Sequence, residues 1–166
     1  MPELLAFADR KKEGTFPVTD GDGVLVARIR VSGWAGTRFA AETAAGEPLC
    51  SGRTRGWFSR WWDVLDPGGA VLASMRGRGN RSRVVLTDGR ELRVRGRAFF
   101  RNDWSLLDAQ GSPLLASEPS GSGFWHPDAW AVRVLDESLG LALVIGVVQT
   151  NRLMVKSERA AATTAS

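Results

Sequence analysis

The 166-residue sequence contains one cysteine, one histidine and no tyrosine. One Cys excludes an intrachain disulfide framework, and one Cys with one His cannot supply the usual ligands of a metal cluster. We therefore expect neither a metal nor another cofactor. The N-terminus also lacks a charged segment followed by an apolar one, so we expect a protein of the reducing cytoplasm.

Long apolar runs are missing as well. The longest, residues 139–148, has ten residues, and a membrane-spanning helix needs about 20. A helix here would be apolar on every face, so protein would have to surround it. Acidic and hydroxyl side chains at 136–138 and polar ones at 149–152 are typical of helix ends. The sequence predicts a buried helix over about 138–150, with a buried strand as the alternative.

Glycine and two aromatic residues are abundant, with 19 Gly, seven Trp and seven Phe. This composition favours many short strands joined by glycine turns. The length suits one domain with a sizeable core. A hydrophobic content of 43% and a charged content of 24% are ordinary for a globular chain, so global disorder is not expected.

A pattern of strand, polar turn and strand repeats along the chain. In most copies an Asp stands at the turn and a Gly follows it, because the Asp side chain binds turn amides and Gly accepts a positive φ. Short strands are also predicted near Leu4–Phe7 and at 129–134. Five successive hairpins predict an antiparallel meander, at residues 18–26, 38–50, 62–74, 84–94 and 104–117.

These hairpins, followed by one hydrophobic helix, resemble the tubby C-terminal-like superfamily, which includes the LURP-one-related proteins and the phospholipid scramblases. The resemblance covers about residues 3–156. It rests on the repeated Trp-x-[Val/Leu]-Leu-Asp-x-x-Gly hairpins, the turn at 18–23, and Ala-Val-Arg-Val at 131–134 before the apolar run.

The resemblance implies a mainly β fold, a closed antiparallel barrel of about 12 strands around one buried C-terminal helix. We expect a single domain over 1–156, with a final strand or turn at 153–155 and a disordered tail of small residues over 157–166. Tubby proteins bind phosphoinositides and scramblases are associated with lipid movement. The family therefore implies an anionic phospholipid surface as the partner.

Positive charge is concentrated in one predicted hairpin. Residues 76–97 hold eight Arg against Asp88 and Glu91, a net charge of +6 compared with +4 for the whole chain. Alternation places the Arg side chains of 93–97 on the outer face of a strand, where guanidinium groups are suited to phosphates of lipid or nucleic acid. Codon bias in a GC-rich genome would also supply a solvated Arg face. The candidate residues are Arg76, Arg78, Arg81, Arg83, Arg93, Arg95 and Arg97.

The densest aromatic patch lies at residues 57–62. Trp62 fits the hairpin motif and is expected in the core. Trp57 and Trp61 are candidates to be exposed, where they would insert at a membrane interface or stack on a base.

Other reactive side chains favour structural roles. The Asp-Gly-Asp-Gly segment at 20–23 lacks the later ligands of a calcium loop, so we expect a turn. His126 has only Asp128 beside it, and we expect it to pack on an aromatic residue. Cys50 is expected to be a small buried side chain. Because no nucleophile with a base stands out, we expect no enzymatic activity.

The sequence therefore favours a monomeric, non-enzymatic binding module in the cytoplasm, peripheral at the inner membrane face, which recognises anionic phospholipid headgroups. Two alternatives stay open. One is a structural or protein-interaction domain with no lipid ligand. The other is a nucleic-acid binder through the Arg-rich loop at 76–81.

Overall fold

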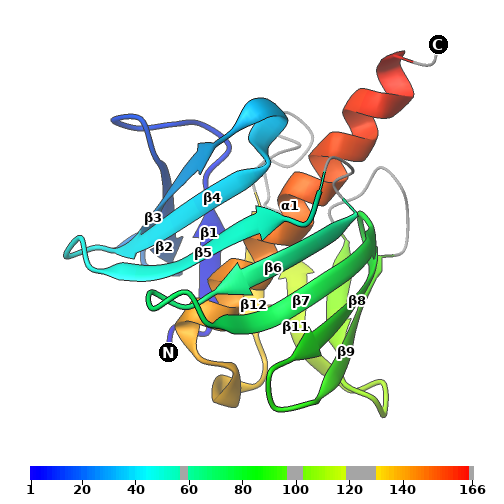
Figure 1. Ribbon diagram of the computed structural model, residues 1–166. Helices are drawn as coiled ribbons and strands as arrows, with labels where there is room; N and C mark the ends of the chain where they lie inside the picture. Colours follow the sequence, from blue (N-terminus) through cyan, green and yellow to red (C-terminus); the bar gives the residue numbers. More distant parts are fainter. Residues whose placement is uncertain (57–59, 97–102, 119–129, 165–166) are drawn as a thin grey trace.

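Twelve antiparallel strands form a closed barrel around one long helix, α1 (Leu141–Thr164), in the computed structural model (Figure 1). The structure describes residues 1–56, 60–96, 103–118 and 130–164. The predicted 12-strand barrel and its single C-terminal helix are thus confirmed. The strands are β1 (Leu4–Phe7), β2 (Phe16–Asp20), β3 (Leu25–Ser32), β4 (Arg38–Thr43), β5 (Pro48–Thr54), β6 (Trp61–Leu65), β7 (Val71–Arg78), β8 (Arg81–Leu86), β9 (Glu91–Gly96), β10 (Trp104–Leu107), β11 (Pro113–Glu118) and β12 (Trp130–Val134).

The order of the strands around the barrel is their order in the chain. Each strand pairs with its sequence neighbours, and β1 closes the ring because it pairs with both β2 and β12. Leu5, for example, lies opposite Asp20 on one side and Val132 on the other. Such a meander needs only short connections, and its closure leaves no unpaired edge strand.

One end of the barrel, which we call the turn end, carries the five hairpin turns that the sequence predicts. At the β6–β7 turn, Asp66 Oδ1 accepts a hydrogen bond from the amide of Ala70 at 2.8 Å, and Gly69 has a φ of +86°. The turn after β2 is built in the same way, because Asp20 Oδ1 accepts from the amide of Val24 at 2.9 Å. The expected turn at residues 20–23, rather than a calcium loop, is therefore confirmed.

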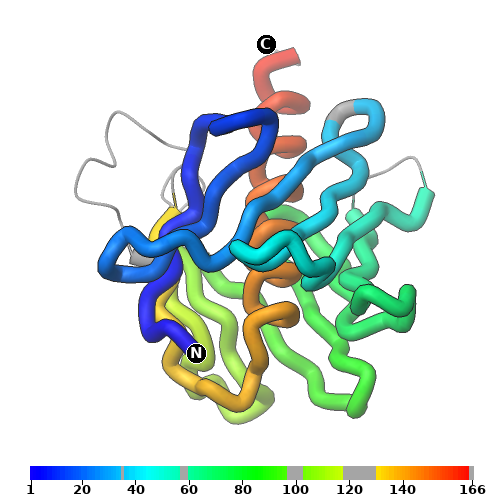
Figure 2. Tube along the Cα trace, turned by 90° about the vertical axis from the view of Figure 1, so that its left-hand side faces the viewer, coloured from blue at the N-terminus to red at the C-terminus, as the bar shows by residue number. Residues whose placement is uncertain are grey.

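Helix α1 enters the barrel at the turn end and leaves at the opposite end, which we call the helix-exit end (Figures 1 and 2). A short 3₁₀ turn, η2 (Glu137–Leu139), precedes α1 and is capped by Asp136, whose Oδ1 accepts from the amide of Ser138 at 2.9 Å. Gly140, with a φ of +59°, separates this turn from α1. The helix therefore begins at Leu141 and not at 138.

The end of α1 also differs from the expectation. The helix continues to Thr164, so residues 153–155 are not a strand and residues 157–164 are helical instead of a disordered tail. No Gly or Pro follows Gly146 in the helix, and the Ala-rich segment 158–162 has high helix propensity. Tail composition alone was a poor guide because small residues such as Ala also favour helices.

The core consists of the inner faces of the strands packed around α1. Val144, Ile145, Val147 and Val148 are all 0% exposed, which confirms that every face of this part of the helix meets protein. Gly146 allows the helix to approach β6, since a Cβ at that position would lie 2.3 Å from Val64 Cγ1. Helix and sheet are thus in direct contact across the barrel interior.

Two further predictions about buried side chains are confirmed. Trp62 is 1% exposed and Cys50 is buried in β5. Burial raises the pKa of the Cys50 thiol to about 12. The thiol therefore stays protonated at neutral pH. Because the thiolate is the reactive form of cysteine, Cys50 is an unreactive core side chain.

Substitution of Gly146 by Val tests the contact between helix and barrel. The new side chain would overlap Val64, which is fully buried and cannot move into solvent. We expect the free energy of unfolding, measured in urea, to fall by about 2–3 kcal/mol, at the upper end of overpacking costs. Adding Val64→Ala should recover part of this loss. A Gly146→Val protein as stable as wild type would contradict the packing described.

Candidate anion-binding surface

Six arginines stand in two rows across three neighbouring strands, β7, β8 and β9. In the first row Arg76 lies opposite Arg83, and Arg83 lies opposite Arg93. In the second row, nearer the helix-exit end, Arg81 lies opposite both remaining members, one on β7 and one on β9. All six side chains are exposed. We call this set the arginine grid: Arg76, Arg78, Arg81, Arg83, Arg93 and Arg95.

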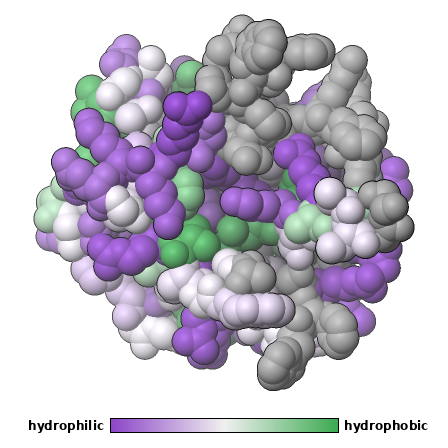
Figure 3. Space-filling view, turned by 90° about the horizontal axis from the view of Figure 1, so that it is seen from above, coloured by the Kyte–Doolittle hydropathy of each residue, from purple (hydrophilic) through white to green (hydrophobic). Residues whose placement is uncertain are grey.

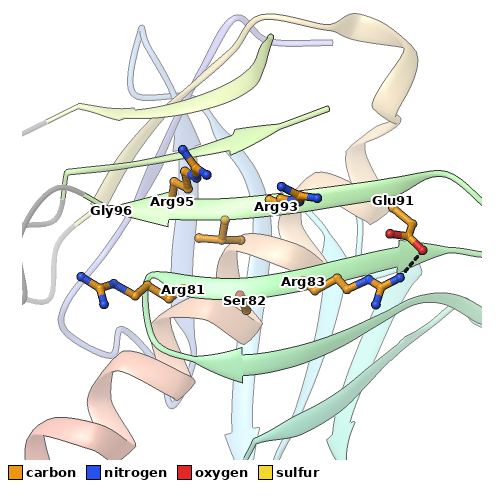
Figure 4. Close-up of a pocket in the computed structure, with 8 residues that line it drawn as sticks. Arg81, Ser82, Arg83, Glu91, Arg93, Arg95 and Gly96 are labelled. Atoms are coloured by element: carbon orange, nitrogen blue, oxygen red, sulfur yellow. Dashed lines mark hydrogen bonds and ion pairs between the residues drawn. The ribbon is translucent and has the colours of Figure 1, made fainter. Parts of the chain in front are cut away.

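Strand alternation explains why these side chains share the outer surface. On β9 the side chains of Leu92 and Val94 are buried. Because side chains alternate along a strand, those of Arg93 and Arg95 point outward. Strands lie about 4.8 Å apart and every second residue along a strand is about 7 Å further on. The Cα positions of the six arginines therefore cover only about 10 by 7 Å. Figure 4 shows the four guanidinium groups on β8 and β9.

Few carboxylates neutralise the grid. Arg83 forms an ion pair with Glu91, drawn as a dashed line in Figure 4. Arg81, Arg93 and Arg95 make no hydrogen bond or ion pair with any residue that the structure describes. Together with Arg83 they line an open pocket of about 700 Å³. Three uncommitted guanidinium groups thus face solvent around one concave site.

Trp61 adjoins the grid at the next strand, β6. It is 38% exposed, and its ring lies 5.2 Å from the guanidinium carbon of Arg76 on β7 and 4.7 Å from that of Arg55, just after β5. Cations over an indole ring are attracted by its quadrupole. Trp61 therefore supports two guanidinium groups and does not present a bare ring for a base to stack on.

The late turns of α1 bring an acid to the edge of the grid. Glu158 packs against the β7–β8 turn so closely that a Cβ on Gly79 would lie 2.6 Å from Glu158 Oε2. Burial raises the pKa of Glu158, while the charges of Arg78 and Arg60 act in the opposite direction. Arg78 is consequently the member of the grid whose field the helix partly offsets.

The structure brings most of the sequence-predicted site residues together. The six grid arginines are contiguous and Trp61 adjoins them. Arg97 and Trp57 lie outside the described residues, as does His126. The cluster of all the predicted residues is therefore observed only in part.

Three residues with notable interactions or exposure in the structure were not singled out from the sequence. Asp63 forms an ion pair with Arg55, and the pKa of Glu158 is influenced by the charges of Arg78 and Arg60, which are distant from it in the chain. Trp34 lies in the 3₁₀ turn η1 (Trp34–Gly36) between β3 and β4 and is 85% exposed. The only sequence signal for the exposure of Trp34 was its position in a loop between Gly33 and Gly36.

The fold is similar to that of a solved structure from Arabidopsis thaliana, the protein AT5G01750. The two superpose with a TM-score of 0.61 at 17% sequence identity, covering 89% of this chain and 91% of that one. No family model matches the sequence. No curated protein matches it either. At this identity the likeness establishes the barrel fold alone.

Two kinds of feature are missing from the residues that the structure describes. No helix is both long and apolar enough to cross a membrane. No group of three or more His, Cys, Asp or Glu side chains that could hold a metal ion occurs in the part of the chain that the structure covers.

Asp63, at the border of the arginine grid, has a buried carboxylate that accepts two side-chain hydrogen bonds. Its Oδ2 accepts from Arg55 Nε at 2.6 Å and its Oδ1 from Ser74 Oγ at 2.7 Å. Burial by itself would raise the pKa of Asp63, but these hydrogen bonds and the Arg55 charge hold it below its usual value. Arg55 is thereby fixed over Trp61, which in turn contacts Arg76.

Asp63→Asn should reduce stability in a pH-dependent way. At neutral pH the variant loses a charged hydrogen-bond acceptor, which costs about 1.5–3 kcal/mol. The folded-state pKa of Asp63 lies below the unfolded value of about 3.9, so this contribution is present at neutral pH and disappears as the pH falls through the folded-state pKa. In urea unfolding, the gap between wild type and Asp63→Asn should narrow below about pH 4. A gap that is constant down to about pH 2 would contradict the ion pair.

Proposed function

We propose that the protein is a non-enzymatic module that binds anionic phospholipid headgroups at a membrane surface through the arginine grid. The observation that carries the proposal is the set of three uncommitted guanidinium groups, on Arg81, Arg93 and Arg95, within a cluster of six. Guanidinium groups bind phosphate through two parallel hydrogen bonds, so a cluster of them favours a partner with clustered phosphates.

The energetic cost of the grid supports a binding role. Like charges directly opposite each other weaken the pairing of strands, and the register places Arg next to Arg on both sides of β8. A surface that served only solubility would not need this arrangement, because dispersed charges serve equally well. An anionic partner would relieve the repulsion on binding.

The acids of the hairpin turns lie closer to the first row of the grid than to the second. Most hairpin turns at the turn end carry an Asp whose carboxylate binds turn amides, as Asp20, Asp66 and Asp108 do. The second row of the grid lies toward the other end of the barrel. Asp108, however, directly follows Leu107, which pairs with Arg93 of the first row. Charges separated by more than about 10 Å are largely screened at physiological salt. The second row is therefore the part of the grid that the turn acids neutralise least.

Lipid is favoured over nucleic acid by the aromatic residue beside the grid. Single-stranded nucleic acids are bound by basic grooves with aromatic rings on which bases stack. The ring of Trp61 instead contacts two guanidinium groups. A headgroup layer needs only charge and hydrogen-bond donors, which the grid supplies.

Membership of the tubby C-terminal-like superfamily is part of the proposal. The repeated hairpins, the barrel and its buried C-terminal helix support it. Its tubby members bind phosphoinositides, which agrees with an Arg-rich surface. A cytoplasmic, monomeric protein that is peripheral at the inner membrane face completes the proposal, since that leaflet is anionic.

Cosedimentation with vesicles tests the proposed ligand. Wild type should bind vesicles containing phosphatidylserine or a phosphoinositide and not neutral vesicles, and added salt should weaken binding. Arg81→Gln/Arg93→Gln/Arg95→Gln removes three charges of about 1 kcal/mol each, so affinity should fall on the order of 100-fold.

The matched control removes three exposed arginines from another part of the barrel wall, Arg30, Arg38 and Arg53, on β3, β4 and β5. It has the same net charge and should keep most of the binding. Equal losses in both triple variants would show that net charge matters and the grid does not. Salt-sensitive binding of DNA or RNA without vesicle binding would identify a nucleic-acid module. Binding to neither would leave the protein-interaction alternative.

Glu158→Gln should strengthen binding to acidic vesicles. The substitution removes the acid that lies beside the β7–β8 turn while keeping its shape. Removal of one repulsive charge near the surface should raise affinity about fivefold. Glu13→Gln, which makes the same change in the exposed β1–β2 loop, should have a smaller effect. Equal effects of the two substitutions would contradict the placement of the binding face.

A further inference from the structure

A second pocket, of about 540 Å³, opens at the helix-exit end of the barrel. Its walls come from β2, β3, the start of β12 and the outward-going turns of α1. The arginine grid, on β7 to β9, lies on another part of the barrel wall. The proposed headgroup surface therefore does not account for this pocket.

The wall of the pocket is apolar at the edge of the core. Phe16, Val31 and Leu153 are half-buried and pack against the core, while Trp130 and Val155 are buried. Seen from the helix-exit end, apolar side chains lie in the middle of the face with hydrophilic ones around them (Figure 3). Half-buried apolar side chains around a concave site are typical of a site for a small apolar ligand.

The rim of the pocket is positively charged. Lys11 has its Nζ 5.7 Å from the centre of the Phe16 ring, and Lys156 is exposed on α1. Neither lysine makes a hydrogen bond or ion pair with a residue in the described ranges. Arg152 is committed to the backbone, since its Nη2 donates to the carbonyl of Ala8 at 2.9 Å.

The other polar side chains of the pocket do not reverse this charge. Asp9 is the one acid among the described residues that line the pocket, and Arg159 adds a further cation. Asp9, Ser157 and Arg159 each have interactions of their own. The two lysines are therefore the free charges that a ligand would meet.

We propose that this pocket binds the hydrocarbon chain of a single-chain anionic amphiphile, of which a long-chain fatty acid is the simplest. The chain lies against Phe16, Val31 and Leu153, and the anionic head lies between Lys11 and Lys156. The volume falls within the range of about 300–1,000 Å³ of small-molecule sites. The proposal does not depend on the function assigned to the arginine grid.

Trp34 lies in the chain between two glycines that line the same pocket. It is 85% exposed between Gly33 and Gly36, and both glycines line the pocket. An exposed Trp is favoured at the boundary between water and lipid, where its ring is partly apolar and its N–H stays hydrated. The chain that enters the pocket can thus come from a free amphiphile or from a membrane lipid.

Calorimetric titration with decanoate and laurate, each kept monomeric, tests the site. Wild type should bind one molecule, and affinity should rise about fourfold for each added methylene. Leu153→Gln should weaken laurate binding at least tenfold, because it places an amide in the apolar wall. The matched control is Leu72→Gln, a half-buried leucine on β7 at the turn end, which should bind as wild type does.

The charged rim is tested by comparing decanoate with 1-decanol. Wild type should prefer the anion, and Lys11→Gln/Lys156→Gln should lose that preference while binding of the alcohol is retained. Lys12→Gln, in the same loop as Lys11 but outside the pocket lining, is the control and should keep the preference. Circular dichroism should show that all variants keep the wild-type fold.

The outcomes separate this site from the arginine grid. Absence of saturable laurate binding to the folded wild type, or laurate binding by Leu153→Gln as tight as wild type, would overturn the proposal. Laurate binding that survives in the Arg81→Gln/Arg93→Gln/Arg95→Gln variant would support it whatever that variant does on vesicles. If Leu153→Gln loses vesicle binding as well as laurate, the chain belongs to a membrane lipid; if it loses laurate alone, the ligand is a free amphiphile.

Discussion

The structure depends on filling a wide barrel with a helix that is apolar on all sides. A closed ring of about eight strands can be filled by its own side chains, whereas this ring has twelve and encloses α1. Burial of one large aliphatic side chain contributes about 1.5–3 kcal/mol. Four valine and isoleucine residues of α1, two on each side of Gly146, are completely buried. Gly146 is needed because the side chain of Val64 on β6 occupies the place where a Cβ would lie.

The same helix organises both candidate surfaces after it leaves the core. On one side Asn151 Nδ2 donates to Asn80 Oδ1 at 3.0 Å, which ties α1 to the β7–β8 turn beside the arginine grid. About two helical turns further on, Glu158 lies against Gly79 of the β7–β8 turn. On the other side Arg152 donates a hydrogen bond to the carbonyl of Ala8 and lines the pocket at the helix-exit end. A shift of α1 along its axis would therefore change the grid and the pocket together.

The two ends of the barrel differ because their connections have different physical tasks. Tight hairpins at the turn end need side-chain acceptors for their amides, which Asp supplies, so carboxylates gather there. The second row of the grid, by contrast, lies near the helix-exit end, where Arg81 faces an arginine on each neighbouring strand. The second row is thus the part of the grid that lies furthest from the carboxylates of the hairpin turns.

The sequence by itself determined the hairpins, the identity of the buried helix and the outward face of Arg93 and Arg95, while the closed barrel was implied only by the family resemblance. These features rest on interactions between residues a few positions apart, such as an Asp and the amide four residues later, or on the period of two along a strand. Such signals are complete within a short window, which is why the Asp-x-x-Gly turns and the core position of Trp62 were predictable.

Only the tertiary structure decided how far α1 extends, which arginines have partners and where the pocket at the helix-exit end lies. Asn80 and Asn151 are 71 residues apart in the chain, yet they hold the helix to the grid. Glu158 reaches the β7–β8 turn only because the strands before it close into a ring around α1. Contacts between distant segments depend on the complete packing of the chain, and no local pattern of residue types encodes them.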